Sequence, residues 1–368
     1  NMLLVLDNFE QLLRFSRGEH GSGTGEKLVT DILAAAPAVK ILVTSREALN
    51  VQQEWFHPVE GMQYPMAVEL EDGGAAISLD DYEAIALFAQ CARRARPGFS
   101  LTDERRAVTR ICQLVEGMPL AIELAAAWLK ALPPAKIAVE IDCGLDILAT
   151  SLKDVAPRHR TMRAVFDHSW SLLSVPERVV MRALSVFRGG FRCRAAEKVA
   201  GASLPLLAGL AEKSLLRVDA AGRYQMHELL RQVAADKLKD DPEEKDRALD
   251  RHSAYYAAFV QEHGQALRGA EQKSALAEME AEIENTRAAW NWAVERAQVE
   301  QLDKAVNGLC RFYEWRGLFQ EGEVACREAE TRLATLEGPT LNVLRTLAKT
   351  LAWQGAFNWV MGLSLIHI

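Results

Sequence analysis

The chain has 368 residues, of which 49% are apolar and 25% are charged, and these are ordinary values for a globular protein. They argue against a disordered or fibrous chain, and the length suffices for two to four domains with substantial cores. A formal net charge of −7 disfavours a protein whose main work is wrapping nucleic acid.

The cysteines and histidines do not form metal-binding patterns. Six cysteines are scattered without a CxxC pair, which favours buried free thiols in a reducing compartment. No histidine pair has the HExxH spacing, so no transition-metal site is predicted. No uncharged apolar run approaches the roughly 18 residues of a membrane helix, and no signal peptide precedes the first strand. We therefore expect a soluble, cytoplasmic protein without a membrane partner.

The first predicted element is a strand at Met2–Leu6, where five apolar residues are followed at once by Asp7. Such a run is typical of a central strand in a parallel sheet covered on both faces. Ligands bind at the carboxyl ends of these strands, where an aspartate can hold Mg²⁺ on a nucleotide. Asp7 is thus a candidate catalytic residue and metal ligand at the end of a Walker B-like strand. The alternative is an ordinary solvent-facing acid.

A second strand is predicted at Val39–Val43, after a helix over 28–36 that Pro37 stops. Together they form a βαβ crossover. The glycine-rich loop 21–27 resembles a phosphate-binding loop but lacks the glycine before its lysine and the hydroxyl after it. One more short strand is predicted at Trp55–Val59.

The region 77–150 is predicted to be helical, after an acidic linker over 66–76. Asp80 and Asp81 are expected to cap its first helix. Apolar positions recur at helical spacing in two helices: Ile85, Phe88 and Ala92, then Val108, Ile111, Cys112 and Val115. Gly117 is expected to end the second helix and Pro119 to begin the next, over 120–132.

Residues 158–240 have the pattern of a winged helix. Helices are predicted over 162–173, 176–187, 194–200 and 205–215, and two strands over 216–218 and 223–226 flank a turn that contains Gly222. His227 directly precedes a helix over 228–239. By residue type alone, this histidine could equally be a capping or surface residue.

The rest of the chain is predicted to be helical after a charged linker over 239–244. The expected helices span 251–264, 272–297, 301–315 and 319–336, and a further pair begins near Leu341. The segment 302–329 resembles one tetratricopeptide-type repeat. Stacked helix pairs of this kind make concave surfaces that bind protein or peptide.

The order of several stretches resembles the signal-transduction ATPases with numerous domains, the NB-ARC-like class of P-loop NTPases. These stretches are Met2–Asp7, Ile41–Arg46, Gly117–Ala121 and Met226–Leu230. The nearest pattern is the bacterial regulator type with a winged helix and tetratricopeptide-like repeats, and the likeness extends from residue 1 to about residue 335. It implies a mainly α multidomain fold with a partial parallel α/β NTPase sheet, a helical lid, a winged helix and an α-solenoid.

The resemblance implies a role for each matched residue in a nucleotide (ATP/ADP) and Mg²⁺ site of the full-length protein. Asp7 would hold Mg²⁺, Arg46 would reach the γ-phosphate, and Pro119 beside Gly117 would pack against the adenine. His227 would contact the diphosphate of ADP. Glu10 is the remaining acid that could orient water. Asn8 stands where many relatives have a second acid, which suggests slow hydrolysis suited to a switch.

The expected domains are 1–65, the C-terminal part of the nucleotide-binding fold without its P-loop, then 77–150, the helical lid. They are followed by 155–240, the winged helix, and 245–361, the repeats. Both ends look cut, so we expect a fragment of a longer protein that is inactive without its P-loop.

The predicted function is a nucleotide-switched signalling ATPase of a transcriptional or signalling regulator. Its repeats would sense a protein or small-molecule signal, and the activated protein would self-associate. Two alternatives are a DNA-binding winged-helix transcription factor and a nucleotide-independent scaffold. The predicted recognition helix, 205–214, offers one lysine and no arginine, asparagine or glutamine for base edges, so no direct DNA binding is expected.

Overall fold

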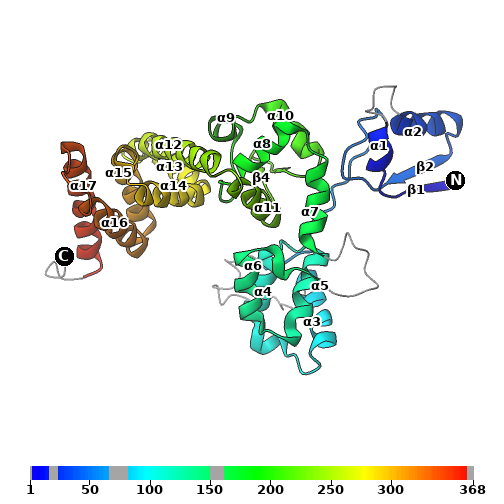
Figure 1. Ribbon diagram of the computed structural model, residues 1–368, viewed down its shortest axis with the longest axis horizontal. Coiled ribbons are helices and arrows are strands. Elements are labelled where there is room, and N and C mark those ends of the chain that lie inside the picture. Colours follow the sequence, from blue (N-terminus) through cyan, green and yellow to red (C-terminus); the bar gives the residue numbers. More distant parts are fainter. Residues whose placement is uncertain (1, 16–23, 66–81, 150–160, 363–368) are drawn as a thin grey trace. The chain divides into compact units, whose positions relative to one another are not determined.

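The computed structural model describes residues 2–15, 24–65, 82–149 and 161–362 (Figure 1). The predicted linker over 66–76, the caps Asp80 and Asp81 and residues 21–23 of the predicted loop lie outside these ranges. The chain divides into two compact units, which are described separately. Unit 1 contains residues 1–173, 205–218 and 226–233, and unit 2 contains 174–204, 219–225 and 234–368. The four predicted domain boundaries stay predictions.

Unit 1 begins with the predicted βαβ crossover. Strands β1 (Met2–Leu6) and β2 (Val39–Val43) pair in parallel, with Leu6 opposite Val43. Between them lie α1 (Glu10–Phe15) and α2 (Thr24–Ala35), which cover one face of the pair (Figure 1). The core beneath these helices consists of Phe9, Leu13, Val29 and Leu49, with Leu6, Ile41 and Val43 packed against it.

Two strand predictions in this region are wrong. The expectation that Met2–Leu6 is covered on both faces fails, because Leu3, Val5 and Leu42 are more than half exposed. In the described residues this sheet has two strands and helices on one face only, so apolar side chains of the other face lack a cover. No strand forms at 55–59, where Trp55 is 96% exposed, and in the part of the chain that the structure describes no other strand pairs with that segment.

The helical region of unit 1 follows the predicted pattern closely. Its helices are α3 (Glu83–Ala95), α4 (Leu101–Leu114), α5 (Pro119–Ala127) and α6 (Pro134–Cys143). The seven predicted core positions of α3 and α4 are all buried. The helix predicted to run to residue 132 ends earlier, because α5 tightens into a 3₁₀ turn at Trp128–Lys130.

Residues 161–239 form the predicted series of helices and two short strands. They are α7 (Met162–Ser171), α8 (Val175–Leu184), α9 (Cys193–Ala200), α10 (Leu204–Glu212), β3 (Arg217–Val218), β4 (Tyr224–Gln225) and α11 (Glu228–Lys239). Gly222 has φ +73°, as the turn between the strands requires.

The remaining helices of unit 2 are α12 (Pro242–Ala266), α13 (Gln272–Ala281), α14 (Ile283–Glu295), α15 (Val299–Arg316), α16 (Phe319–Ala334) and α17 (Leu341–Val360). Several bounds differ from expectation, and two of the differences have a clear local cause. The predicted linker 239–244 is short, because Asp241 accepts the Glu244 amide at 3.1 Å and caps α12. The predicted helix 272–297 breaks at Glu282, whose side chain is drawn into a buried network.

The cysteines are less uniformly buried than expected. Cys112, Cys310 and Cys326 are buried, Cys91 and Cys193 are half-buried, and Cys143 is exposed. The Sγ atoms of Cys310 and Cys326 lie 3.4 Å apart as free thiols, and burial raises the pKa of Cys310 well above its usual value.

Candidate functional site

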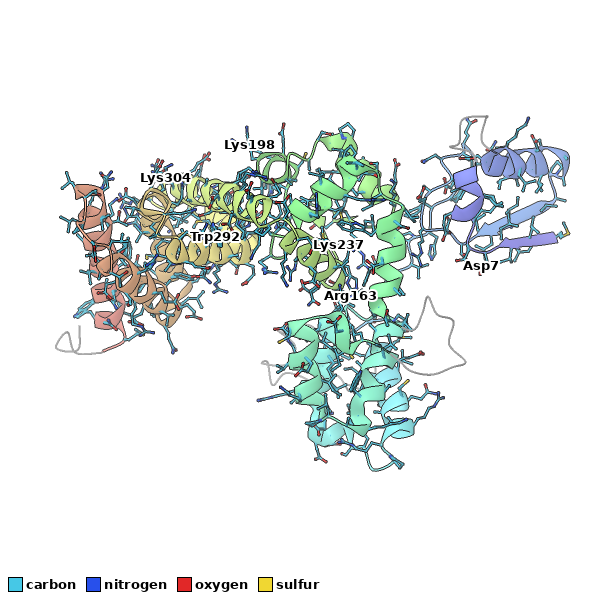
Figure 2. All side chains as sticks on the ribbon, viewed as in Figure 1. Asp7, Arg163, Lys198, Lys237, Trp292 and Lys304 are labelled. Atoms are coloured by element: carbon cyan, nitrogen blue, oxygen red, sulfur yellow. The ribbon has the colours of Figure 1, made fainter. Side chains whose placement is uncertain are left out.

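Asp7 lies at the strand edge where the sequence places it (Figure 2). Because β1 and β2 are parallel and in register, their carboxyl ends meet, and Thr44 after β2 reaches Asp7 after β1. The Thr44 hydroxyl donates to Oδ1 of Asp7 and accepts the Asn8 amide at 3.1 Å. Asp7 is exposed, so its carboxylate and the threonine hydroxyl present two oxygens to solvent. Such hard oxygen ligands suit Mg²⁺.

Arg46 and Glu10 form an ion pair beside this edge. Nε of Arg46 lies 3.9 Å from Oε1 of Glu10, which is only 4% exposed at the start of α1. Nη1 of Arg46 donates to Ser169 on α7 at 2.8 Å. Oε2 of Glu10 is buried and makes no hydrogen bond among the described residues. In this conformation Glu10 therefore positions Arg46 rather than facing open water.

The helix corner before α5 is confirmed as a tight backbone turn. Gly117 has φ +67°, and its carbonyl accepts the Met62 amide at 2.9 Å. A Cβ on Gly117 would lie 2.0 Å from the Met62 carbonyl oxygen, so only glycine fits. Pro119 occupies the first turn of α5 and is exposed, which leaves its ring accessible to a ligand.

Glu116, which directly precedes Gly117 in the helix corner, contacts both His227 and the start of α11. Oε1 of Glu116 accepts the backbone amide of Glu228 at 2.7 Å and lies 3.8 Å from Nδ1 of His227. The Leu229 amide donates to that Nδ1 at 3.2 Å, so Nδ1 is the acceptor of the ring. The proton of the neutral imidazole then sits on Nε2, which is buried and has no hydrogen-bond partner among the described residues.

The charge of His227 follows from its burial. Loss of solvent is the largest effect and lowers the pKa of His227 below its usual value, and Arg217 lowers it further. The Glu116 and Glu228 carboxylates and the Val115 backbone act in the opposite direction but do not offset the burial. The imidazole is therefore neutral at pH 7, and its buried N–H on Nε2 is a donor that could meet an anionic oxygen.

The six predicted site residues fall into two groups. Asp7, Glu10 and Arg46 lie around the strand edge, and the other group is Gly117, Pro119 and His227. Within the described ranges, no hydrogen bond or ion pair joins a member of one group to a member of the other. No set of three or more His, Cys, Asp or Glu side chains in these ranges could hold a metal ion, so a Mg²⁺ at Asp7 would also need phosphate or water ligands.

Sequence patterns alone missed Glu116 and Thr44. Glu116 carries a signal, since it directly precedes Gly117 and takes φ +47°, a conformation in which residues other than glycine are uncommon. Its partner lies 112 positions further along the chain, which no local pattern reveals. Thr44 follows the second strand and could have been found from the meeting of parallel strand ends.

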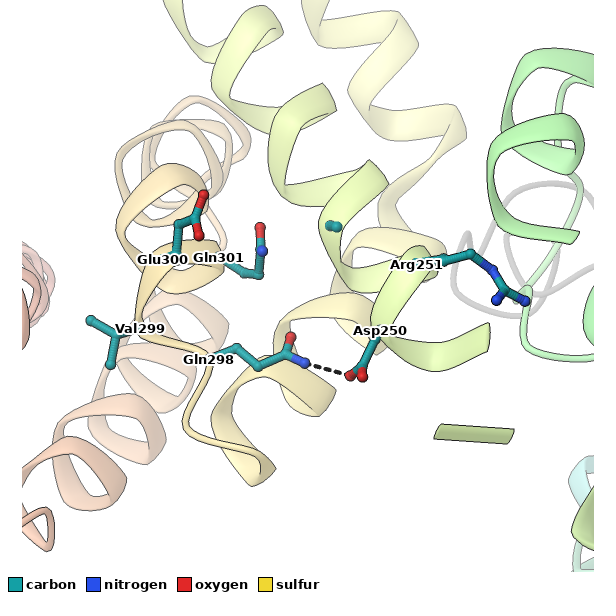
Figure 3. Close-up of a pocket in the computed structure, with 7 residues that line it drawn as sticks. Asp250, Arg251, Gln298, Val299, Glu300 and Gln301 are labelled. Carbon is teal, nitrogen blue, oxygen red and sulfur yellow. Dashed lines mark hydrogen bonds between the residues drawn. The ribbon is translucent and has the colours of Figure 1, made fainter. Parts of the chain in front are cut away.

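A separate hollow of about 520 Å³ lies between α12 and the start of α15 (Figure 3). Its carboxylates already have partners: Asp250 accepts from Gln298 at 2.5 Å and from Trp292 at 2.8 Å, and Glu300 pairs with Lys304 at 2.7 Å. Figure 3 shows Arg251 pointing away from Gln298 and Glu300. This open surface is a weaker candidate than the two groups above.

Fold and site together define a mainly helical multidomain protein with a small parallel α/β element and an acid at its strand end. Within the parts of the chain that the structure describes, no helix has the length and apolar content that a membrane crossing requires.

No protein-family model matches the chain. In sequence it is similar to proteins of Mycobacterium bovis and Mycobacterium tuberculosis, each described as a "Putative HTH-type transcriptional regulator", with 33% identity over 332 residues. The match covers 87% of this chain and 34% of each regulator, so the chain spans about a third of their length. An uncharacterized Mycobacterium tuberculosis protein is 31% identical over 254 residues, 66% of this chain and 58% of that protein.

Among solved structures, the chain is similar to a signal transduction ATPase with numerous domains and a tetratricopeptide repeat sensor from Pyrococcus horikoshii. The two share 14% identity over 98% of this chain and 65% of the other, with a TM-score of 0.24. A TM-score of 0.24 does not establish a common fold.

Proposed function

We propose that this chain is part of a nucleotide-switched regulator. Bound ADP would hold the segment of His227 at the Gly117–Pro119 corner, and a signal received by the helical repeats would favour exchange for ATP. The observation that carries this proposal is the contact of Glu116 with Glu228 and His227. It brings together two stretches that the resemblance assigns to one nucleotide site, and the buried Nε2 of His227 makes no hydrogen bond among the described residues.

The residue roles rest on the resemblance and on the geometry of the two groups. Asp7 and Thr44 would supply oxygen ligands to Mg²⁺, which neutralises phosphate charge when bound. Arg46, positioned by Glu10 and Ser169, would bind the terminal phosphate. His227 would donate from Nε2 to a diphosphate oxygen. Pro119 would pack against the base.

The arrangement of the other domains also belongs to this proposal. Helices α7–α11 with β3 and β4 would form a winged helix that acts as an internal lid. Helices α12–α17 would form tetratricopeptide-like repeats whose concave surface binds a protein or small-molecule signal. Self-association would follow from opening of the lid.

Calorimetry with Mg-ADP tests nucleotide binding. The 368 residues contain no GxxxxGK[ST] motif, whose amides and lysine supply most of the grip on phosphates. The remaining contacts contribute about 1–3 kcal/mol each. An association cost of at least about 4 kcal/mol offsets much of that. We expect a millimolar or weaker Kd for this chain and a micromolar Kd for a longer protein that includes an upstream P-loop.

Two outcomes of this titration would contradict the proposal. A micromolar Kd for the 368 residues would place the phosphate site within them. A longer protein with a P-loop that does not bind Mg-ADP would favour the nucleotide-independent scaffold.

The second candidate function is direct DNA binding, which the names of the mycobacterial relatives favour. The candidate recognition helix was predicted over 205–214; α10 ends at Glu212 and carries no basic residue, and Lys213 follows its end. A mobility-shift titration at physiological salt should therefore show no binding tighter than the non-specific range of roughly 10⁻⁴ to 10⁻⁶ M. A mobility shift of DNA that resists salt and depends on the DNA sequence would instead favour direct DNA binding over the nucleotide switch.

A further inference from the structure

A buried ion pair lies in unit 2 between the start of β4 and the junction of α13 and α14. Arg223 is 9% exposed, and its guanidinium donates to Glu282. It also donates to the backbone carbonyls of Gly190 at 2.8 Å and Ala281 at 3.0 Å. Glu282 is 5% exposed and receives the Tyr256 hydroxyl on its other oxygen at 2.9 Å.

Asn285 completes this network. Its Nδ2 donates to Glu282 at 3.0 Å and to the Gly190 carbonyl at 2.9 Å, and its Oδ1 accepts the Arg188 amide at 2.7 Å. Both carboxylate oxygens of Glu282 therefore have donors. Burying two charges costs free energy of desolvation, which is offset only when the other donors and acceptors of the pair also form hydrogen bonds. A network with all of its hydrogen bonds formed favours a single arrangement of its side chains.

The same network holds the turn and strand β4. Oδ1 of Asp219 accepts the amides of Ala221 at 2.8 Å and Arg223 at 2.9 Å. Tyr224 exchanges two backbone hydrogen bonds with Phe191, each of 2.8 Å. A side chain on Gly190 would meet the Tyr224 carbonyl oxygen at 3.0 Å. Residues 223–225 are thus held in unit 2 by backbone hydrogen bonds to Phe191, just before α9, and by the Arg223 side chain at the α13–α14 junction.

His227 follows Arg223 by four residues. An extended chain of four residues spans at most about 14 Å, so the link offers little slack. We propose that Arg223 and Glu282 form an anchor that transmits changes in the α13–α14 junction to His227. Arg223 is then a positioning residue, because it acts on the candidate nucleotide site only through β4 and His227. The regulatory meaning of the anchor rests on the proposed function, whereas its mechanical coupling does not.

Hydrogen–deuterium exchange of the full chain tests the coupling without nucleotide. The amides of Glu228 and Leu229 report on the His227 segment, because they donate to Glu116 and to His227. We expect Glu282→Gln and Arg223→Met to accelerate exchange of both amides at least tenfold. Tyr256→Phe removes a single hydroxyl from the network and should give a smaller increase in exchange rate, of about threefold. This milder variant keeps the test valid if the first two do not fold.

Two control variants separate coupling from general loss of stability. Glu284→Gln on α14 breaks an exposed ion pair with Arg287 and should leave exchange at Glu228 and Leu229 unchanged. Val260→Ala, at a fully buried position of α12, should destabilise unit 2 without accelerating the exchange of the Glu228 and Leu229 amides.

The anchor is overturned by either of two results. In one, the anchor variants accelerate exchange at Tyr224 but not at Glu228 and Leu229. In the other, Val260→Ala accelerates Glu228 and Leu229 as much as Glu282→Gln does. Failure of the nucleotide switch would instead appear as unchanged ADP release after substitution of His227, so the two failures are distinguishable.

Discussion

Gly308→Ala is expected to destabilise unit 2 by about 3 kcal/mol. A Cβ at Gly308 on α15 would lie 2.2 Å from the carbonyl oxygen of Val260 and 2.7 Å from its Cγ1. The facing Gly264 on α12 is equally tight, since its Cβ would lie 2.5 Å from the Gly308 Cα. The obstacle is helix backbone, so α12 and α15 must separate. That cost outweighs the roughly 1 kcal/mol by which a helix favours alanine over glycine.

Urea denaturation of Gly308→Ala, followed by circular dichroism, measures this loss. Gly269→Ala is the matched control, because the nearest atom to its Cβ is the Ala266 carbonyl oxygen at 3.8 Å. The control should change the free energy of unfolding by less than about 0.5 kcal/mol. Equal stability of the two variants would show that α12 and α15 do not cross this closely.

Acidification from pH 7 to pH 4 is expected to remove about 3 kcal/mol of stability from unit 2 through His252 alone. Burial lowers the pKa of His252 to about 4, with Asn285 raising it and Arg188 lowering it further. The ring is packed between Phe187 and Tyr256, 5.2 and 4.8 Å from its centroid. Since the unfolded histidine has the ordinary pKa, this stability is complete above about pH 6.5 and is lost as the pH falls towards 4.

His252→Gln removes the titrating group and tests this pH dependence. The free energy of unfolding of both proteins is measured by urea titration at several pH values. Between pH 7 and pH 4 its decrease should be about 3 kcal/mol smaller for the variant than for the wild type. Identical slopes for the two proteins in that window would mean that His252 is not the buried neutral group described above.

Elements with strong local signals could be predicted from sequence. The strand bounds of β1 and β2 and the bounds of α11 match the structure, because an apolar run, a stop residue or a charged turn marks each end. The segment 55–59 has the residue types of a strand, but none of the described strands pairs with it. Helical periodicity continues through Glu282, and the helix breaks there because distant donors from Arg223 and Tyr256 hold the carboxylate.

The candidate site was predictable only in part, for a similar reason. Motif positions singled out Asp7, Arg46, Gly117 and His227, and the structure places each at an element end that local sequence determines. The roles of these residues stay predictions. Glu116 was missed, because its importance lies in a tertiary contact with the start of α11 rather than in any local pattern.

ADP release from a longer protein that includes a P-loop measures the role of His227 most directly. A fluorescent ADP analogue displaced by excess ATP gives the dissociation rate. We expect His227→Ala to release ADP at least tenfold faster, because a buried hydrogen bond to a charged phosphate is lost. His263→Ala, which removes a histidine paired with Glu278 in unit 2, should release ADP at the wild-type rate. An ADP dissociation rate unchanged by His227→Ala would contradict the proposed nucleotide switch.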